Sequence, residues 1–200
     1  MTSAKATDRG KLTVLSGART AEHPERPRPW KSTVAAAAAQ AFLAACTSPR
    51  RRRAAVRELM EQLVSGDPYD HRCAAEVARL VSQRQPGALA GYSDLLADAA
   101  AAFPDEEWQA RGYAIVAAAL NAGTAAQRRR LLPTIRERLR EEERTAVRAM
   151  ALEALLVLGA WDAAIREEAL EALEDAQRSP IPAMRARAKR FLPMAMKSGG

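Results

Sequence analysis

The feature that most constrains this 200-residue chain is an arginine that recurs with the period of a helical hairpin. It occurs at Arg72, Arg111, Arg148 and Arg185, at steps of 39, 37 and 37 residues. An alanine stands three residues after each of these arginines, and an acidic residue stands five residues before the first three. A period of this length is typical of proteins that stack pairs of helices. The chain is therefore predicted to fold into about four similar helical hairpins.

Composition supports an all-α fold. Aromatic residues make up only 4 % of the chain, whereas alanine, leucine, arginine and glutamate are abundant, and this mixture favours helices over strands. Residues 1–30 contain six basic and three acidic side chains, so they hold +3 of the net charge of +7, and the remainder holds +4. A charge this modest permits nucleic-acid binding without arguing for it.

Four segments can be distinguished. Residues 1–30 mix glycine and proline with scattered charges and are predicted to be a disordered tail. Residues 31–47 include an alanine-rich stretch that is predicted to form an N-terminal capping helix. Residues 48–196 form the predicted repeat domain, and residues 197–200 a flexible C-terminus.

Proline, glycine and capping residues predict where the helices begin and end. Ser48 and Asp162 are predicted helix caps, Thr124 and Gln127 form a predicted capping box, and Gly66 and Gly159 are predicted to close helices. The predicted repeat helices cover residues 50–64, 67–82, 86–102, 105–121, 124–141, 144–158, 162–177 and 182–194.

The cleanest copy of the repeat resembles a known family. Its residues Glu143, Val147, Arg148, Ala151 and Leu155 are similar to the second helix of HEAT repeats. The preceding segment, Leu131 to Ile135, resembles the first helix of such repeats, in which an interior proline bends the helix. Pro133 occupies that position.

The resemblance covers residues 49–194 as four repeats, 49–83, 86–121, 124–158 and 162–194. Residues 179–187 also resemble small bacterial HEAT-repeat proteins of undefined activity. The resemblance implies a right-handed, armadillo-type α-solenoid in which the second helices line a concave surface. It does not specify a function, because this architecture serves many roles.

The recurring arginines have two interpretations. In the first, each guanidinium bonds to an acid at a helix start, such as Asp67, Glu106 or Glu143, and Arg72, Arg111, Arg148 and Arg185 form a structural ladder. In the second, they are a row of cations for phosphates. The nearby acids favour the ladder.

The concave face is the predicted binding surface. Its outward positions are mostly apolar, which is unusual for a solvated helix face, so either curvature hides them or an apolar partner segment covers them. Aromatic residues near its mouth would suit a peptide anchor. The candidate partner-binding residues are Tyr69, Val77, Leu80, Trp108, Val116, Glu153, Leu156 and Arg190.

Little in the sequence predicts catalysis. His71 and Cys73 offer two potential metal ligands, fewer than the four of a structural zinc site, and no cofactor is predicted. Some DNA alkylation-repair glycosylases have a HEAT-like fold with a tryptophan and a carboxylate in a basic cleft. Trp108 with Asp105, or Trp161 with Asp162, are the candidates for those roles, although the predicted concave row lacks the positive charge that phosphates require.

Two further alternatives concern basic clusters and location. The arginines at 50–53 and 128–140 are predicted to lie on convex first helices, interleaved with acids in the second cluster. Leu43 to Cys46 resembles a lipoprotein acylation motif, but the long, proline-containing start is unlike an export signal. The favoured hypothesis is a non-catalytic, cytoplasmic scaffold or adaptor that binds a protein or peptide. A nucleic-acid-binding relative of the glycosylases is the alternative.

Overall fold

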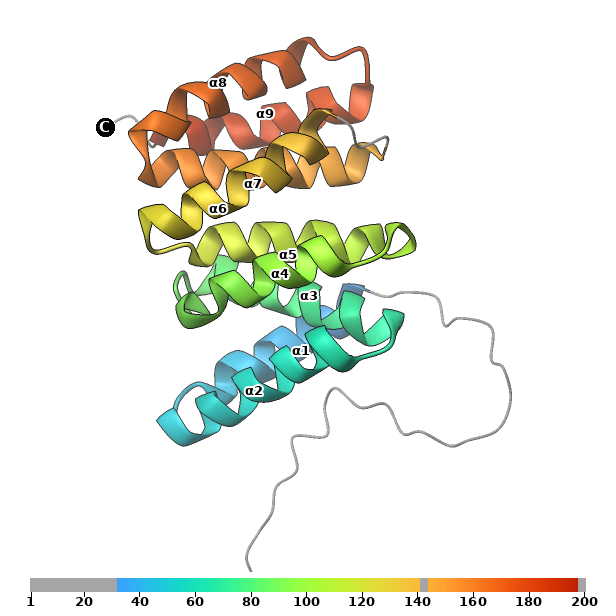
Figure 1. The fold of residues 1–200 in the computed structure, drawn as a ribbon, viewed down its shortest axis with the longest axis vertical. Helices are drawn as coiled ribbons and strands as arrows, with labels where there is room; N and C mark the ends of the chain where they lie inside the picture. Colours follow the sequence, from blue (N-terminus) through green and yellow to red (C-terminus); the bar gives the residue numbers. More distant parts are fainter. Residues whose placement is uncertain (1–31, 141–143, 198–200) are drawn as a thin grey trace, which may run out of the picture.

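The computed structural model describes residues 32–140 and 144–197, and within these ranges the chain is helical and contains no strand (Figure 1). The predicted tail at residues 1–30 and the last three residues lie outside the described ranges. None of the helices that are described is long and apolar enough to cross a membrane. The elements are α1 (Ser32–Ala45), α2 (Pro49–Ser65), α3 (Pro68–Arg84), η1 (Ala90–Tyr92), α4 (Ser93–Ala102), η2 (Asp105–Glu107), α5 (Trp108–Asn121), α6 (Ala125–Arg140), α7 (Thr145–Trp161), α8 (Ala163–Arg178) and α9 (Pro182–Lys197).

Each helix packs against its neighbours in two layers. In the inner layer, α3 packs against α1 and α5, α5 against α7, and α7 against α9. In the outer layer, α2, α4, α6 and α8 each pack on the inner helix that follows them in the chain. Helices α1 and α2 lie at one end of the molecule and α8 and α9 at the other (Figure 1).

Two of the predicted caps form as expected and one does not, and Asp67, where a helix was predicted to begin, is also a cap. The Asp67 side chain accepts hydrogen bonds from two backbone N–H groups at the start of α3. Thr124 and Gln127 form the reciprocal capping box, each side chain accepting the other's backbone N–H at 3.2 Å. Asp162 caps α8 by accepting from Ala164 N at 3.0 Å. Ser48 precedes α2 in an extended conformation, but its side chain makes no capping bond.

Two predicted helix boundaries are wrong, and each has a physical cause. The helix predicted from residue 86 begins only at Ser93, because Gly87 takes a left-handed conformation (φ 78°) and the segment turns before η1. Gly159 does not end α7, which continues to Trp161. Gly66 does end α2, but in an extended conformation. A Cβ there would overlap the Gln62 carbonyl oxygen and the Asp70 Cβ, so the close join between α2 and α3 requires glycine.

The core follows the inner layer. Helix α5 is buried almost all round, and five consecutive residues from Ala114 to Ala118 have no exposed surface. The reason is that α5 has α3 and α7 on its flanks and α4 on its outer side. Alanine side chains at such positions let neighbouring helices approach closely, so this helix is held by packing from several sides.

A buried polar network joins the first two hairpins. The Asn121 amide, at the end of α5, donates to Ser82 Oγ on α3 at 2.7 Å and to Ala117 O at 2.8 Å. Asn121 Oδ1 accepts the backbone N–H of Leu89 at 3.0 Å. Ser82 Oγ in turn donates to Ala78 O at 2.7 Å. Every polar atom of the Asn121 side chain therefore has a partner inside the core.

Helix α1 is an integral part of the inner layer. It packs against α3 and buries Ala35, Ala38, Ala39 and Phe42. Cys46 follows it directly and is half-buried, with its backbone N–H bonded to Phe42 O. Because cleavage before Cys46 would remove α1, the lipoprotein alternative would cost the inner layer its first helix.

Candidate functional site

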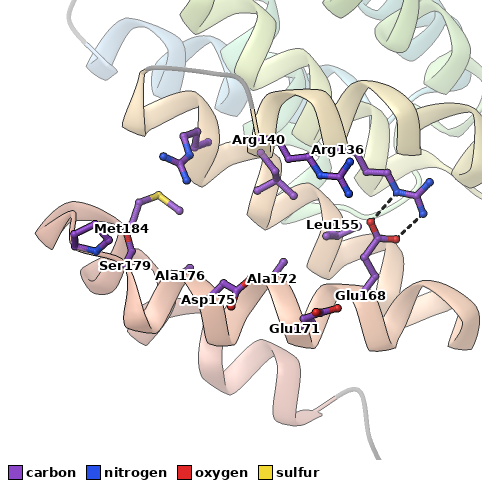
Figure 2. Close-up of a pocket in the computed structure, with 13 residues that line it drawn as sticks. Arg136, Arg140, Leu155, Glu168, Glu171, Ala172, Asp175, Ala176, Ser179 and Met184 are labelled. Carbon is purple, nitrogen blue, oxygen red and sulfur yellow. Dashed lines mark hydrogen bonds and ion pairs between the residues drawn. The ribbon is translucent and has the colours of Figure 1, made fainter.

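A cavity of about 390 Å³ lies between α6 and α8, with α7 and the start of α9 forming its floor (Figure 2). Both outer helices contribute charged side chains, and the floor is mostly apolar. Its lining consists of Arg136, Leu139, Arg140, Arg148, Leu155, Glu168, Glu171, Ala172, Asp175, Ala176, Ser179, Pro180 and Met184. The cavity is on the outer side of the molecule, away from the face that the sequence predicted to be the binding surface.

One ion pair holds the two walls together. Arg136 on α6 donates from Nε and Nη2 to the two carboxylate oxygens of Glu168 on α8, both at 2.7 Å. These hydrogen bonds lower the pKa of Glu168, and the nearby charges of Arg136 and Arg140 act in the same direction, whereas partial burial opposes them. Two parallel bonds fix the geometry of such a pair as well as its energy. The pair therefore sets the distance between α6 and α8 at this end of the cavity.

Beyond that pair, the two walls carry opposite charges that do not touch. Figure 2 shows Arg140 on α6 across the cavity from Glu171 and Asp175 on α8. Arg148 projects from the floor, and its Nε is buried without a hydrogen-bond partner among the described residues. Its predicted partner, Glu143, lies outside the described ranges. Arg148 therefore adds a third arginine to the lining of the cavity, although its Nε atom is itself buried.

The floor between these charges is apolar. Leu155 of α7 and Ala176 of α8 are buried there, and Met184 of α9 closes one end. Leu139 of α6 and Ala172 of α8 are half-buried and pack against the core. An apolar floor between a cationic and an anionic wall suits a peptide segment that carries both charges, because a carboxylate can meet the arginines while a cation meets the acids.

The predicted apolar row on the inner layer is not available to a partner. Val77 and Val116 have no exposed surface, and Leu156 is only 5 % exposed. The reason is that α3, α5 and α7 lie side by side and cover the flanks of one another. These three predicted partner-binding side chains therefore have almost no surface that a partner could contact.

Polar side chains close over that row. Gln83 Nε2 on α3 donates to Glu153 Oε1 on α7 at 2.8 Å, although α5 lies between these two helices. Beside this bond, the Arg79 guanidinium stacks 5.1 Å from the ring centroid of Tyr113. Burial raises the pKa of Tyr113, and nearby Glu76 adds to this, whereas the arginines on α3 and α9 oppose it. Glu153 is thus part of a bridge within the molecule.

The other candidate partner-binding residues are scattered. Tyr69 is 41 % exposed at the start of α3 and Arg190 is exposed on α9, at opposite ends of the molecule. Leu80 and Trp108 are half-buried. Leu80 packs against the hydrophobic core. The structure therefore does not bring the eight candidates together into one surface.

Two of the recurring arginines, Arg111 and Arg185, bond to the turn before their own helix. Arg111 is 3 % exposed and donates to Phe103 O at 2.6 Å and to Asp105 Oδ1 at 2.9 Å. The bonded acid is Asp105, whereas the predicted partner of Arg111 was the next residue, Glu106. Arg185 donates to Ser179 O at 2.7 Å. In both cases the guanidinium reaches the turn that precedes its own helix.

His71 and Cys73, the two potential metal ligands, lie in different environments. His71 Nδ1 is 2.7 Å from Glu107 Oε2, and its ring packs against Phe103. Cys73 is buried, and burial raises the pKa of its thiol to about 11, with smaller effects from Glu76 and Asp70. Among the described residues, no group of three or more potential ligands is arranged to hold a metal ion.

The carboxylates considered for a glycosylase role are already engaged. Asp105 accepts the bond from Arg111, which lowers the pKa of Asp105. Asp162 caps α8 and lies 3.8 Å from Arg128 Nε. Both carboxylates therefore have structural partners, and the adjacent Trp161 is 71 % exposed at the end of its helix.

Several arginines that were not predicted as site residues join successive hairpins. They lie on the outer helices rather than in the repeated arginine positions. Arg52 donates to Ala88 O at 2.8 Å, Arg130 pairs with Asp94 at 3.0 Å, and Arg136 pairs with Glu168. Their partners are 32 to 36 residues away, close to one repeat period. A search for opposite charges at that spacing would have found the pairs of Arg130 and Arg136, but not the bond from Arg52 to a backbone carbonyl.

Comparisons with known proteins give no relative for this chain. No family model, no curated protein and no experimentally determined structure matches it.

Proposed function

We propose that this chain is a non-catalytic scaffold or adaptor that binds a peptide segment of a protein partner in the cavity between α6 and α8. The observation that carries the proposal is the opposite charge of the two walls, since Arg140 faces Glu171 and Asp175 over an apolar floor and has no bond to either. The thirteen lining residues include one hydroxyl, Ser179, and no histidine or cysteine that could activate it. This composition suits recognition better than nucleophilic chemistry.

We also propose an architecture for this chain. We place the chain among HEAT-like α-solenoids of right-handed, armadillo type, in a bacterial cytoplasm. The 37-to-39-residue period and the packing of each outer helix on the following inner helix support this assignment. The proposed binding site differs from the sequence prediction, because the inner apolar row is buried and the outer cavity is open.

A charge reversal inside the cavity tests the proposal. Arg140→Glu would place a third anion opposite Glu171 and Asp175, and we expect it to remove the partner from affinity purifications of the tagged protein in its native cells. Arg129→Glu is the matched control, since Arg129 is an exposed residue of the same helix that does not line the cavity. If both variants retain the partners of the wild-type protein, the cavity is not the binding site.

A nucleic-acid partner is the less favoured alternative, since Asp105 and Asp162 already have structural partners. It predicts salt-sensitive retention on DNA that Arg128→Glu with Arg130→Glu would weaken. Absence of retention at low salt would exclude it.

A further inference from the structure

The net charge of the outer helices alternates along the molecule. Helix α2 carries five arginines and two glutamates, a net charge of +3. Helix α4 carries two aspartates and no basic residue, for −2. Helix α6 carries six arginines and one glutamate, for +5, and α8 carries five acids and two arginines, for −3. The outer layer therefore begins with a basic helix and ends with an acidic one.

Within the molecule this alternation joins neighbouring helices. Arg130 of α6 pairs with Asp94 of α4 at 3.0 Å, and Arg136 of α6 pairs with Glu168 of α8 at 2.7 Å. Basic α6 is thus held by acidic helices on both sides. Among the described helices, α2 and α8 are the first and last of this outer series (Figure 1).

The two terminal outer helices present matching faces. On α2, Arg50, Arg53, Arg57 and Val64 are exposed at helical spacing, and Val64 is 60 % exposed. We call these residues the α2 face. They share one side of the helix because their offsets of 3, 7 and 14 residues are close to whole turns.

On α8, Glu167, Leu170 and Glu174 are exposed at the same offsets of 3 and 7 residues, and Leu170 is 41 % exposed. We call these residues the α8 face. None of them lines the cavity between α6 and α8. Each face therefore combines an exposed aliphatic side chain with charges of one dominant sign, and the signs of the two faces are opposite.

We propose that the chain associates head to tail with a second copy of itself, the α8 face of one copy docking against the α2 face of the next. The contact would continue the charge alternation of the outer layer across the junction, with Val64 and Leu170 burying apolar surface between the ion pairs. In the inner layer, α1 of one copy would lie near α9 of the other. Helix α9 carries five basic residues and no acid, but α1 has no charged residue, so no like charges oppose one another there.

Such an interface uses different surfaces on the two copies, so each copy keeps one free face after it has bound another. Further copies can therefore add until the assembly closes into a ring or extends as a filament. Exposed ion pairs are individually weak and are screened by salt. The association is therefore concentration-dependent and is lost at high ionic strength.

Complementary charge reversals test this contact with the full-length chain. One variant carries Arg53→Glu with Arg57→Glu, and the other carries Glu167→Arg with Glu174→Arg. In analytical ultracentrifugation at low salt, we expect the wild-type chain to form oligomers and each variant alone to sediment as a monomer. An equimolar mixture of the two variants should oligomerise again, because each face then meets its opposite charge on the other variant. Unfolding cannot explain this restoration.

Two results would overturn the proposal. One is a wild-type chain that remains monomeric at high protein concentration and low salt. The other is a mixture of variants that stays monomeric while circular dichroism shows both to be folded. If instead the α2 variant loses retention on DNA and the wild-type chain does not self-associate, the α2 face binds nucleic acid.

This proposal does not depend on the cavity. Arg140→Glu leaves both faces intact and should self-associate as the wild-type chain does. Loss of the partner without loss of oligomers, or the reverse, therefore identifies which of the two proposals fails.

Discussion

Arg136 and Arg140 lie one helical turn apart on α6, but only Arg136 has a bonded partner among the described residues. The difference lies in the opposite wall, since Glu168 reaches Arg136 whereas Glu171 and Asp175 stop short of Arg140 (Figure 2). A single turn of helix thus separates a structural ion pair from a charge that is available to a ligand.

The ion pair between Arg136 and Glu168 is pH-dependent, because the pKa of Glu168 is lowered. Because Arg136 lowers the pKa of Glu168 in the folded state, the pair contributes stability above the unfolded pKa of about 4.5 and loses it as the pH falls through the folded pKa. We expect Glu168→Gln to lower the melting temperature at pH 7, and the difference from the wild-type chain to vanish as the pH falls below that folded pKa. Glu167→Gln, on the exposed side of α8, should show little change at either pH. A pH-independent difference for Glu168→Gln would contradict the assignment.

Residue positions on the inner helices show where sequence periodicity stops being informative. Helical spacing correctly places alanines such as Ala75 and Ala151 in the core, because they recur on one stripe. It wrongly leaves Val77 and Val116 outside, since their burial comes from helices at the flanks. Flank burial depends on the spacing between neighbouring helices, which a single-helix pattern does not contain.

At the scale of elements, the helix order could be predicted because prolines and caps mark most boundaries. The predicted end of α7 was wrong because glycine can either end a helix or allow a close contact between two helices. Gly159 was read as a helix end, but it lies inside α7, where Arg166 and Ala169 of α8 approach its backbone. The cavity between α6 and α8 could not be predicted either, because it depends on the distance between helices from different hairpins.

Two glycines at helix contacts should respond differently to alanine. A Cβ on Gly159 would lie 3.1 Å from the Arg166 Cα, a backbone atom, so Gly159→Ala should destabilise the fold by about 1–3 kcal/mol through overpacking. A Cβ on Gly112 would meet the thioether of Met150, which can change rotamer, so Gly112→Ala should cost less. Urea unfolding measures both. A larger loss for Gly112→Ala would show that Met150 cannot move.

Removal of α1 tests its place in the inner layer. Deletion of residues 1–45 would expose the side of α3 that now packs against Ala35, Ala39 and Phe42. We expect this truncated chain to melt at a clearly lower temperature than a chain lacking residues 1–31, because apolar surface would be returned to water. Thermal unfolding followed by circular dichroism gives the comparison. Equal melting temperatures would mean that α1 contributes little to the stability of the fold.

At the scale of the whole molecule, contacts run mainly between successive hairpins. Stability in such molecules is approximately a sum of terms for each unit and its neighbours. Amide hydrogen exchange should therefore be slowest in α5, which packs against α3, α4 and α7, and faster in α2 and α9 near the two ends. Exchange at one common rate in all helices would show instead that the chain opens as a single unit.

The hydrogen bonds of Asn121 limit how the hairpins of this chain could be rearranged or duplicated. The equivalent position in the first hairpin is Ser82, its partner, whereas in the third hairpin it is Leu158, which has no exposed surface. If a copy of the second hairpin were placed after the third, its amide would face Leu158 instead of a serine and would lose a buried hydrogen bond. The hairpins are similar in structure but not interchangeable, because the contact between Asn121 and Ser82 requires the first two hairpins to be neighbours. A copy of the second hairpin placed elsewhere in the chain would need another residue in place of its asparagine.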